Sequence, residues 1–167
     1  MSLHGDGGRP GWAPFAKPGM GGPVEQRDSG SARARLAPFP NVLYAFDLKK
    51  EGYPLKWKYR PAVSPNAIGV SCCDVINRGA FYADGKIVYN LLDGHTVAVD
   101  AQTGKELWVT QVADVGEGET TPGAPFVAKG RVMVGAAGGE FGVYGWGKGL
   151  DLKTGKQTVV AEDPKAD

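Results

Sequence analysis

The feature that most constrains the fold is an internal repeat with a period of about 50 residues. The segment Ala45-Phe46-Asp47 recurs as Ala98-Val99-Asp100 and, in altered form, as Gly149-Leu150-Asp151, so that the aspartates of successive copies are 53 and 51 residues apart. A second motif, residues 83–88, recurs 45 residues later at 128–133. A period of this length is typical of a β-propeller, in which each repeat is one four-stranded blade.

The residue pattern inside each repeat predicts strands. Short runs of β-forming residues alternate with Asp-Gly, Thr-Gly and Lys-Gly pairs, which are turn signals at close spacing, and no segment holds a helical stripe for three turns. The expected strands include residues 42–46, 87–89, 96–99, 126–128 and 132–134. We therefore predict an all-β chain that forms a partial β-propeller of about two to three four-stranded blades.

Each copy also carries the elements of a docking turn. The repeated Asp and the following Thr-Gly suit a tight turn in which the carboxylate caps backbone N–H groups. Two copies end in Trp57 and Trp108, which we expect to pack flat between neighbouring sheets. The spacing puts Val159 at the corresponding place in the third copy. Because an open stack exposes edge strands and apolar faces, we expect either a piece of a larger propeller or self-association through the open edges.

The two ends of the chain differ from its middle. Residues 1–40 hold 8 of the 26 glycines and 6 of the 12 prolines, and residues 1–36 show neither helical nor strand periodicity. We expect 1–36 to be a disordered or foreign tail without a signal peptide, 37–160 to be the propeller, and 161–167 to be a disordered C-terminus.

Charge and composition exclude several functions. The chain has 19 Lys+Arg against 18 Asp+Glu, a net charge of +1, which gives no electrostatic reason to bind nucleic acid or an acidic membrane surface. No apolar run approaches the roughly 18 residues of a membrane helix. His4 and His95 stand in unrelated contexts, so a histidine-based metal site is not expected.

The chain has two cysteines, Cys72 and Cys73, and they are adjacent. Neighbouring Cα atoms lie about 3.8 Å apart, whereas ordinary disulfides span roughly 4.4–6.8 Å. A bond between them would close a small, strained ring for local shape or redox chemistry. The residues alone leave two unrelated buried thiols as the alternative, and zinc is not expected because nothing completes a tetrahedral set.

Three segments together carry a family resemblance: 72–79 (Cys-Cys-Asp-Val-Ile-Asn-Arg-Gly), 93–108 and 138–143 (Gly-Gly-Glu-Phe-Gly-Val). They resemble the quinoprotein alcohol dehydrogenases of the methanol/ethanol family, which use pyrroloquinoline quinone (PQQ) and a metal ion on an eight-bladed propeller. The resemblance covers about residues 37–156 and the N-terminal part of a family subunit. It implies oxidation of a primary alcohol by hydride transfer to the quinone, a cytochrome c-type electron acceptor and a periplasmic location.

The resemblance also implies roles for individual residues. Cys72 and Cys73 would form the vicinal disulfide that lies against the quinone, and Arg78 would lie near its reactive carbonyls, where a fixed cation stabilises developing negative charge. Glu140 would bind the metal, Ca²⁺ or a lanthanide, since hard cations prefer oxygen ligands. The neighbouring residues expected at the cofactor are Ala137, Gly138 and Gly139.

Several positions depart from the family pattern. Ala137 stands where members carry Ser or Asn, and Pro122 stands at the position of a threonine that contacts the cofactor, with Thr121 next to it. The family's catalytic aspartate, remaining metal ligands and tryptophan floor of the quinone site all belong to later blades. We therefore expect a fragment with no catalytic residue of its own that is inactive alone. The alternatives are a non-catalytic propeller scaffold and a truncated pseudo-enzyme.

Overall fold

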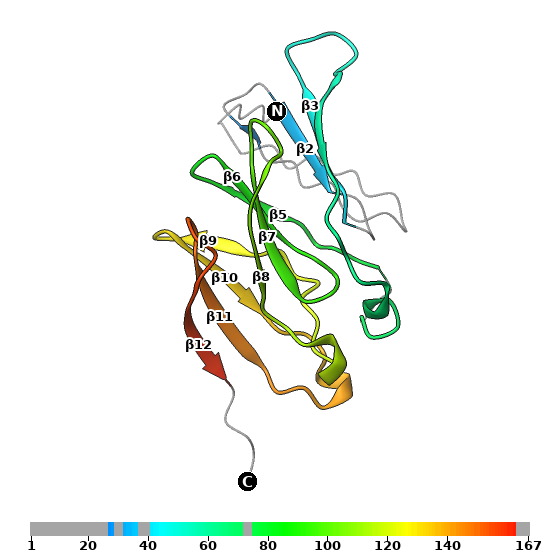
Figure 1. Cartoon of the computed structure of the whole chain (residues 1–167), viewed down its shortest axis with the longest axis vertical. Coiled ribbons are helices and arrows are strands. Elements are labelled where there is room, and N and C mark those ends of the chain that lie inside the picture. Colours follow the sequence, from blue (N-terminus) through cyan, green and yellow to red (C-terminus); the bar gives the residue numbers. More distant parts are fainter. Residues whose placement is uncertain (1–26, 29–31, 37–40, 72–74, 163–167) are drawn as a thin grey trace, which may run out of the picture.

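The short apolar runs fold into antiparallel sheets in the computed structural model, which describes residues 27–28, 32–36, 41–71 and 75–162 (Figure 1). These residues form three four-stranded sheets, each a meander of strands consecutive in the chain. Sheet 1 contains β1 (Arg27–Asp28), β2 (Ala32–Leu36), β3 (Leu43–Asp47) and β4 (Leu55–Tyr59). Sheet 2 contains β5 (Ala80–Ala83), β6 (Lys86–Asn90), β7 (His95–Asp100) and β8 (Glu106–Gln111). Sheet 3 contains β9 (Phe126–Ala128), β10 (Arg131–Gly135), β11 (Trp146–Asp151) and β12 (Gln157–Glu162).

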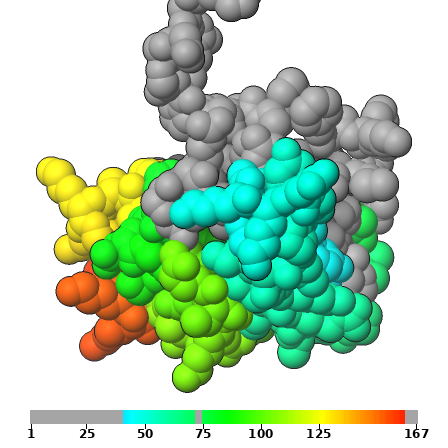
Figure 2. All heavy atoms as spheres, turned by 90° about the horizontal axis from the view of Figure 1, so that it is seen from above, coloured from blue at the N-terminus to red at the C-terminus, as the bar shows by residue number. Residues whose placement is uncertain are grey.

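Sheet 2 is covered on both faces, which explains why β6 and β7 read as continuous apolar runs rather than as alternating ones. Successive side chains of a strand point to opposite faces. Val97 and Val99 accordingly belong to the core shared with sheet 1, whereas Ala98, between them, belongs to the core shared with sheet 3. Figure 2 shows sheet 1 (cyan) and sheet 3 (yellow to red) on opposite sides of sheet 2 (green). The sheets thus stack face to face, as blades of a propeller do.

A tryptophan joins each pair of neighbouring sheets, as the sequence predicts. The indole of Trp57 in β4 packs on Gly104 in the β7–β8 turn, where an added Cβ would lie 2.5 Å from Trp57 Cε3. Its Nε1 donates to the carbonyl oxygen of Ala101 at 3.1 Å. A side chain at Gly104 would therefore displace the ring from its hydrogen bond.

The same contact is repeated between sheets 2 and 3. Trp108 packs on Gly155, where a Cβ would lie 2.6 Å from the indole Cδ2, and its Nε1 donates to the carbonyl oxygen of Leu152 at 3.1 Å. Donor and acceptor are 44 residues apart in both contacts. In sheet 3, Gly149 pairs with Val159 at the place in the register where Ala98 pairs with Trp108 in sheet 2. Val159 therefore occupies the tryptophan position of sheet 3, as predicted.

An aspartate organises each of the two receiving turns. Asp100 Oδ1 accepts hydrogen bonds from the backbone N–H groups of Gln102 and Thr103 and from the Thr103 hydroxyl, at 3.0, 2.8 and 2.8 Å. Asp151 Oδ1 accepts the matching set from Lys153 and Thr154 at the same distances. The predicted capping of the turns is therefore confirmed, and it fixes the glycine on which each tryptophan rests.

The boundaries expected from sequence need correction at both ends. Strands β1 and β2 lie within residues 27–36, in the segment expected to be disordered, and β2 pairs with β3 from Ala32–Asp47 to Leu36–Leu43. The alternation Ala32-Arg33-Ala34-Arg35 is a period of two, but its small alanines gave no recognisable apolar face. Likewise β12 extends to Glu162, past the boundary at 160.

We expect replacement of a docking tryptophan to destabilise the fold. Trp108 is 8% exposed, and Trp108→Ala would remove both its packing and its hydrogen bond. The free energy of unfolding should fall by about 3–5 kcal/mol, measured by urea denaturation. The exposed neighbour Leu107 supplies the control, since Leu107→Ala should change stability by only about 0.5 kcal/mol. Equal losses in the two variants would contradict a docking role for Trp108.

We also expect the two aspartate turns to make stability depend on pH. Hydrogen bonds from Thr103 and Thr154 hold the pKa values of Asp100 and Asp151 below the ordinary value of 3.8. Because the unfolded-state pKa is the higher one, the ionised carboxylates stabilise the fold above about pH 4, and this contribution disappears as the pH falls through the folded-state pKa. The urea midpoint should therefore drop more steeply on acidification in the wild type than in the Asp100→Asn, Asp151→Asn double variant. Parallel curves would show that these carboxylates are not the titrating groups.

Candidate functional site

The connections that carry the predicted site residues lie at one end of the sheets, opposite the docking turns. Three 3-10 helices mark this end: η1 (Pro65–Ala67), η2 (Val115–Glu117) and η3 (Gly139–Phe141). They lie together at the lower end of the molecule in Figure 1. In a meander, the β4–β5, β8–β9 and β10–β11 connections must reach the same end, so residues distant in sequence gather there.

Arg78 lies just before β5, and the backbone around it is fixed on both sides. Its own N–H donates to the carbonyl oxygen of Pro122 at 2.9 Å, which ties the β4–β5 connection to the β8–β9 connection. Asn77 closes a local turn, because its Oδ1 accepts from the N–H of Gly79 at 3.0 Å. Gly79 has φ of 141°, a conformation that glycine adopts without strain. The Arg78 residue itself is exposed, so its guanidinium is presented from a rigid backbone.

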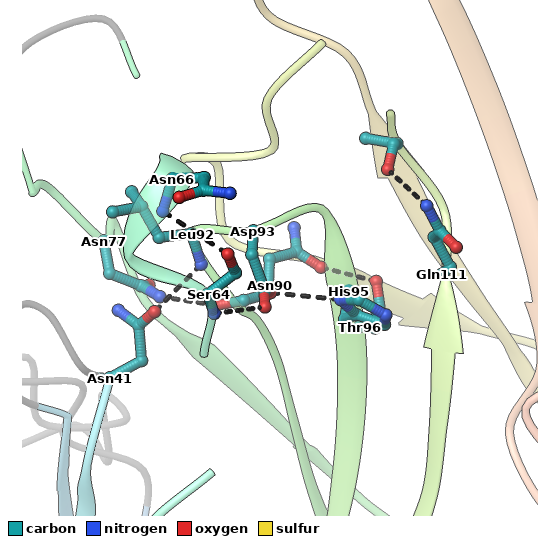
Figure 3. Close-up of polar contacts among 11 residues, drawn as sticks. Asn41, Ser64, Asn66, Asn77, Asn90, Leu92, Asp93, His95, Thr96 and Gln111 are labelled. Atoms are coloured by element: carbon teal, nitrogen blue, oxygen red, sulfur yellow. Dashed lines mark hydrogen bonds and ion pairs between the residues drawn. The ribbon is translucent and has the colours of Figure 1, made fainter. Parts of the chain in front are cut away.

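A network of buried asparagines supports this backbone (Figure 3). Asn77 Nδ2 donates to the carbonyl oxygen of Asn90 at 2.6 Å. Asn90 in turn donates from Nδ2 to the carbonyl oxygen of Gly123 at 2.9 Å and accepts at Oδ1 from the Thr96 hydroxyl at 2.8 Å. Asn77 and Asn90 are 4% and 2% exposed, so these bonds are protected from competition by water. Sheet 2 thereby holds both connections that flank Arg78.

A second part of the network fixes the start of the β4–β5 connection and the approach to β3. Asp93 Oδ2 accepts from the N–H of Ser64 at 2.9 Å, and its Oδ1 lies 3.1 Å from His95 Nδ1 (Figure 3). Asn41, with φ of 59°, accepts at Oδ1 from the N–H of Leu92 at 2.9 Å. His95 is thus a partner of a structural carboxylate.

The predicted cofactor residues of the β10–β11 connection lie against the β8–β9 connection. Ala137 and Thr120 exchange two backbone hydrogen bonds, at 2.8 and 3.1 Å. Gly138 is buried with φ of 124°, and a Cβ there would overlap the carbonyl oxygen of Gly118. Only glycine fits at this position. Gly139 and Glu140 follow in η3, and both are exposed.

Three buried hydroxyl oxygens at this end have no hydrogen-bond partner within the described part of the chain: those of Ser71, Thr120 and Thr121. Thr120 and Thr121 are 1% and 2% exposed. A buried hydroxyl without a partner costs about 1–3 kcal/mol, so such groups are unusual unless something else satisfies them. They flank the segments that carry Arg78 and Ala137. Sequence reasoning did not single out Ser71 or Thr120, because their burial depends on contacts between connections.

The structure therefore brings some of the predicted residues together. Arg78 and Ala137 are linked through residues 120–122, whereas Cys72 and Cys73 lie outside the described residues. Glu140 projects from the neighbouring helix η3, and the described residues hold no group of three or more His, Cys, Asp or Glu that could bind a metal ion. A cleft of about 570 Å³ lies elsewhere, between sheets 2 and 3, and contains none of the predicted residues.

We expect Asn77 to be the residue on which the position of Arg78 depends most. Asn77→Ala would leave the buried carbonyl oxygen of Asn90 and the N–H of Gly79 without their partners. The free energy of unfolding should fall by about 1–3 kcal/mol, measured by thermal denaturation. Asn66→Ala, at an exposed asparagine of the same connection, is the matched control and should be close to neutral. If Asn77→Ala is as stable as the control, the network does not support this backbone.

Comparisons with known proteins agree with this geometry. No family model matches the chain. The chain is 50% identical over 123 residues to the lanthanide-dependent methanol dehydrogenase of Methylacidiphilum fumariolicum, covering 74% of this chain and 20% of that protein. It is 42% identical over 125 residues to subunit 1 of the methanol dehydrogenase [cytochrome c] of Paracoccus denitrificans, covering 71% and 20%. The structure of a europium-containing methanol dehydrogenase superposes with a TM-score of 0.82 at 43% identity, covering 92% of this chain and 27% of that one. The chain thus spans about a fifth of the length of the curated relatives it matches.

No helix in the described ranges is long and apolar enough to cross a membrane.

Proposed function

Since the chain is a homologue of the methanol dehydrogenases, with the three-sheet fold of their N-terminal fifth, we propose that it supplies the first blades of a PQQ-dependent alcohol dehydrogenase. The observation that carries the proposal is that the backbone at Arg78 is held in place by hydrogen bonds. These bonds join it to the Thr121-Pro122 segment and, through Asn77, to sheet 2. The proposed reaction is oxidation of a primary alcohol of the methanol or ethanol type.

The residues at this end of the sheets fit a polar, planar cofactor. The hydroxyl groups of Ser71 and Thr121 are buried and lack partners among the described residues, so they are available to donate to carbonyl or carboxylate oxygens of a bound quinone. Arg78 would place a permanent positive charge beside them. When bound, PQQ accepts the hydride of the alcohol. We propose that Cys72 and Cys73 form a disulfide against one of its faces.

Glu140 would contribute one carboxylate oxygen to a metal ion, a lanthanide or Ca²⁺. Such ions take several oxygen ligands. The described residues hold no group of three or more His, Cys, Asp or Glu that could bind a metal ion, so further ligands would come from the cofactor and from other blades. Gly138 and Gly139 leave the backbone beside Glu140 free of side chains, and the fixed φ of Gly138 sets the direction in which η3 begins.

The chain carries no residue that we assign as the catalytic base. In the proposed role it binds and orients, while the base comes from the rest of the enzyme. We therefore propose that the chain alone is inactive, that the assembled enzyme works in the periplasm, and that a cytochrome c receives its electrons. The name of the Paracoccus relative includes cytochrome c, which supports this acceptor.

The test is complementation in a dye-linked dehydrogenase assay with methanol, PQQ and either La³⁺ or Ca²⁺. The chain should be inactive alone and active when combined with the remaining four-fifths of the Methylacidiphilum enzyme. Arg78→Ala should lower kcat by about 10²-fold or more, because a fixed charge at the reacting carbonyls is lost. The exposed Arg131, at the opposite end of sheet 3, supplies the control Arg131→Ala, which should retain activity.

The activity of the Glu140→Gln variant should no longer increase when metal is added. Glu117→Gln in η2 is the matched control, and its activity should respond to metal as the wild type does. Co-purification of the two parts separates failure to assemble from failure to react. Turnover by the chain alone would contradict the assignment of the base to other blades. An assembled but inactive complex would contradict the proposed enzyme function and favour a scaffold.

A further inference from the structure

The β10–β11 connection, residues 136–145, carries Glu140 and needs contacts outside itself to hold its place. Four of its ten residues are glycine, which loses more conformational freedom on ordering than any other residue. The N–H groups of Phe141 and Val143 both donate to the carbonyl oxygen of Gly138, at 2.8 and 3.2 Å. These bonds shape η3 itself, and neighbouring segments must attach it to the sheets.

Gly118, in the β8–β9 connection, lies directly under η3. A Cβ at Gly118 would lie 3.0 Å from Phe141 Cβ and 3.5 Å from Val143 Cγ2. The carbonyl oxygen of Gly118 occupies the place that a Cβ at Gly138 would take. The two connections are therefore in contact on both sides of Glu140, so a shift of Gly118 would be transmitted to η3.

Glu119, the next residue, links the β8–β9 connection to sheet 3 through its carboxylate. Its Oε2 accepts from the N–H of Asp114 at 2.8 Å, and its own N–H donates to the carbonyl oxygen of Asp114 at 3.1 Å, so the loop that contains η2 closes on itself. Its Oε1 accepts from the indole Nε1 of Trp146 at 2.9 Å. Trp146 is the first residue of β11, where the connection that carries Glu140 ends.

Trp146 is held on several sides. It is 9% exposed, and its carbonyl oxygen accepts from the N–H of Ala136 at 3.1 Å, which joins the two ends of the connection. Lys148 Nζ lies 4.1 Å from the centroid of the indole ring and donates to the carbonyl oxygen of Val112 at 2.5 Å. A cation over the ring and a carboxylate at its N–H both favour one ring orientation. Glu119 is thus attached to a fixed side chain.

We propose that Glu119 is a positioning residue for Glu140. By holding the β8–β9 connection against Trp146, it keeps η3 in one place and so fixes where the Glu140 carboxylate is presented. This inference rests on the proposed role of Glu140 as a metal ligand. Both oxygens of Glu119 accept N–H groups, so its role is to hold the backbone rather than to bind the metal.

Hydrogen exchange of the full chain tests whether Glu119 holds η3. Glu119→Gln keeps the size of the side chain but replaces one acceptor oxygen with an amide group. Exchange of the backbone N–H groups within 136–145 should become about tenfold faster, because the local opening that exposes them loses one opposing hydrogen bond. Trp146→Phe, which removes the indole N–H, should have the same effect. Exchange in β6 and β7 should stay as in the wild type.

Two variants serve as matched controls. Glu117→Gln changes an exposed glutamate of η2, and Trp57→Phe removes an indole N–H that donates to Ala101 at the opposite end of the sheets. Neither should alter exchange within 136–145. Combining Glu119→Gln with Trp146→Phe should accelerate exchange by less than the product of the two single effects, because both remove the same bond.

The consequence for the metal is measured in the assembled enzyme used to test the proposed function. The Glu119→Gln complex should retain La³⁺ about tenfold more weakly than the wild type, measured by mass spectrometry of bound metal after dialysis. Excess La³⁺ should restore its kcat, because Glu140 is still present. Excess La³⁺ should not restore the kcat of Glu140→Gln, which separates a positioning residue from a ligand.

Several results would overturn the proposal. One is exchange within 136–145 that is as slow in Glu119→Gln as in Glu117→Gln. Another is equally faster exchange throughout the sheets, which would indicate a general loss of stability. A third is faster exchange at η3 with La³⁺ retained as in the wild type. A wild-type complex that retains no La³⁺ would overturn the proposed metal site as well, whereas failure of the exchange test alone would leave that site standing.

Discussion

The stacking of an indole ring on a turn glycine is the contact on which the rest of this structure depends. It sets the distance and angle between neighbouring sheets, because the ring can neither approach nor slide without losing its hydrogen bond to Ala101 or Leu152. The aspartate of each receiving turn holds that turn in the shape the ring requires. A chain with few long strands thereby obtains two continuous cores, one on each side of sheet 2.

The placement of the candidate site follows from this arrangement. With the sheets held at their turn ends, the connections at the opposite end meet one another, and hydrogen bonds between connections replace strand pairing there. Asn90 is central, since its main chain and side chain hold Asn77, Thr96 and Gly123 at once. The result is a backbone that hydrogen bonds hold in place around Arg78. The same end also contains three buried hydroxyl groups that have no hydrogen-bond partner among the described residues.

The sequence was most informative where the repeat is regular. The Asp, Thr-Gly and Trp positions predicted the turns, the stacking rings and the place of Val159, because each depends on local chemistry repeated at a fixed spacing. It failed at residues 32–36, where the alternation is real but the small alanines leave it inconspicuous. It made Arg78 and Gly138 candidate site residues only through a resemblance. It gave no sign of the asparagine network, because burial of Asn77 and Asn90 depends on connections distant in sequence.

The separation between the two ends of the sheets also bears on how such a chain can diverge. At the turn end, Gly104 and Gly155 lie under aromatic rings, so neither a larger residue nor a change in turn length is readily accommodated. At the opposite end, the connections that precede β5 and β9 are longer, and the N–H of Arg78 in the first donates to the carbonyl oxygen of Pro122 in the second. Insertions and substitutions can therefore accumulate in the connections, where ligand preference would be set, while the sheets remain in place. One end preserves the architecture, and the other is available for new chemistry.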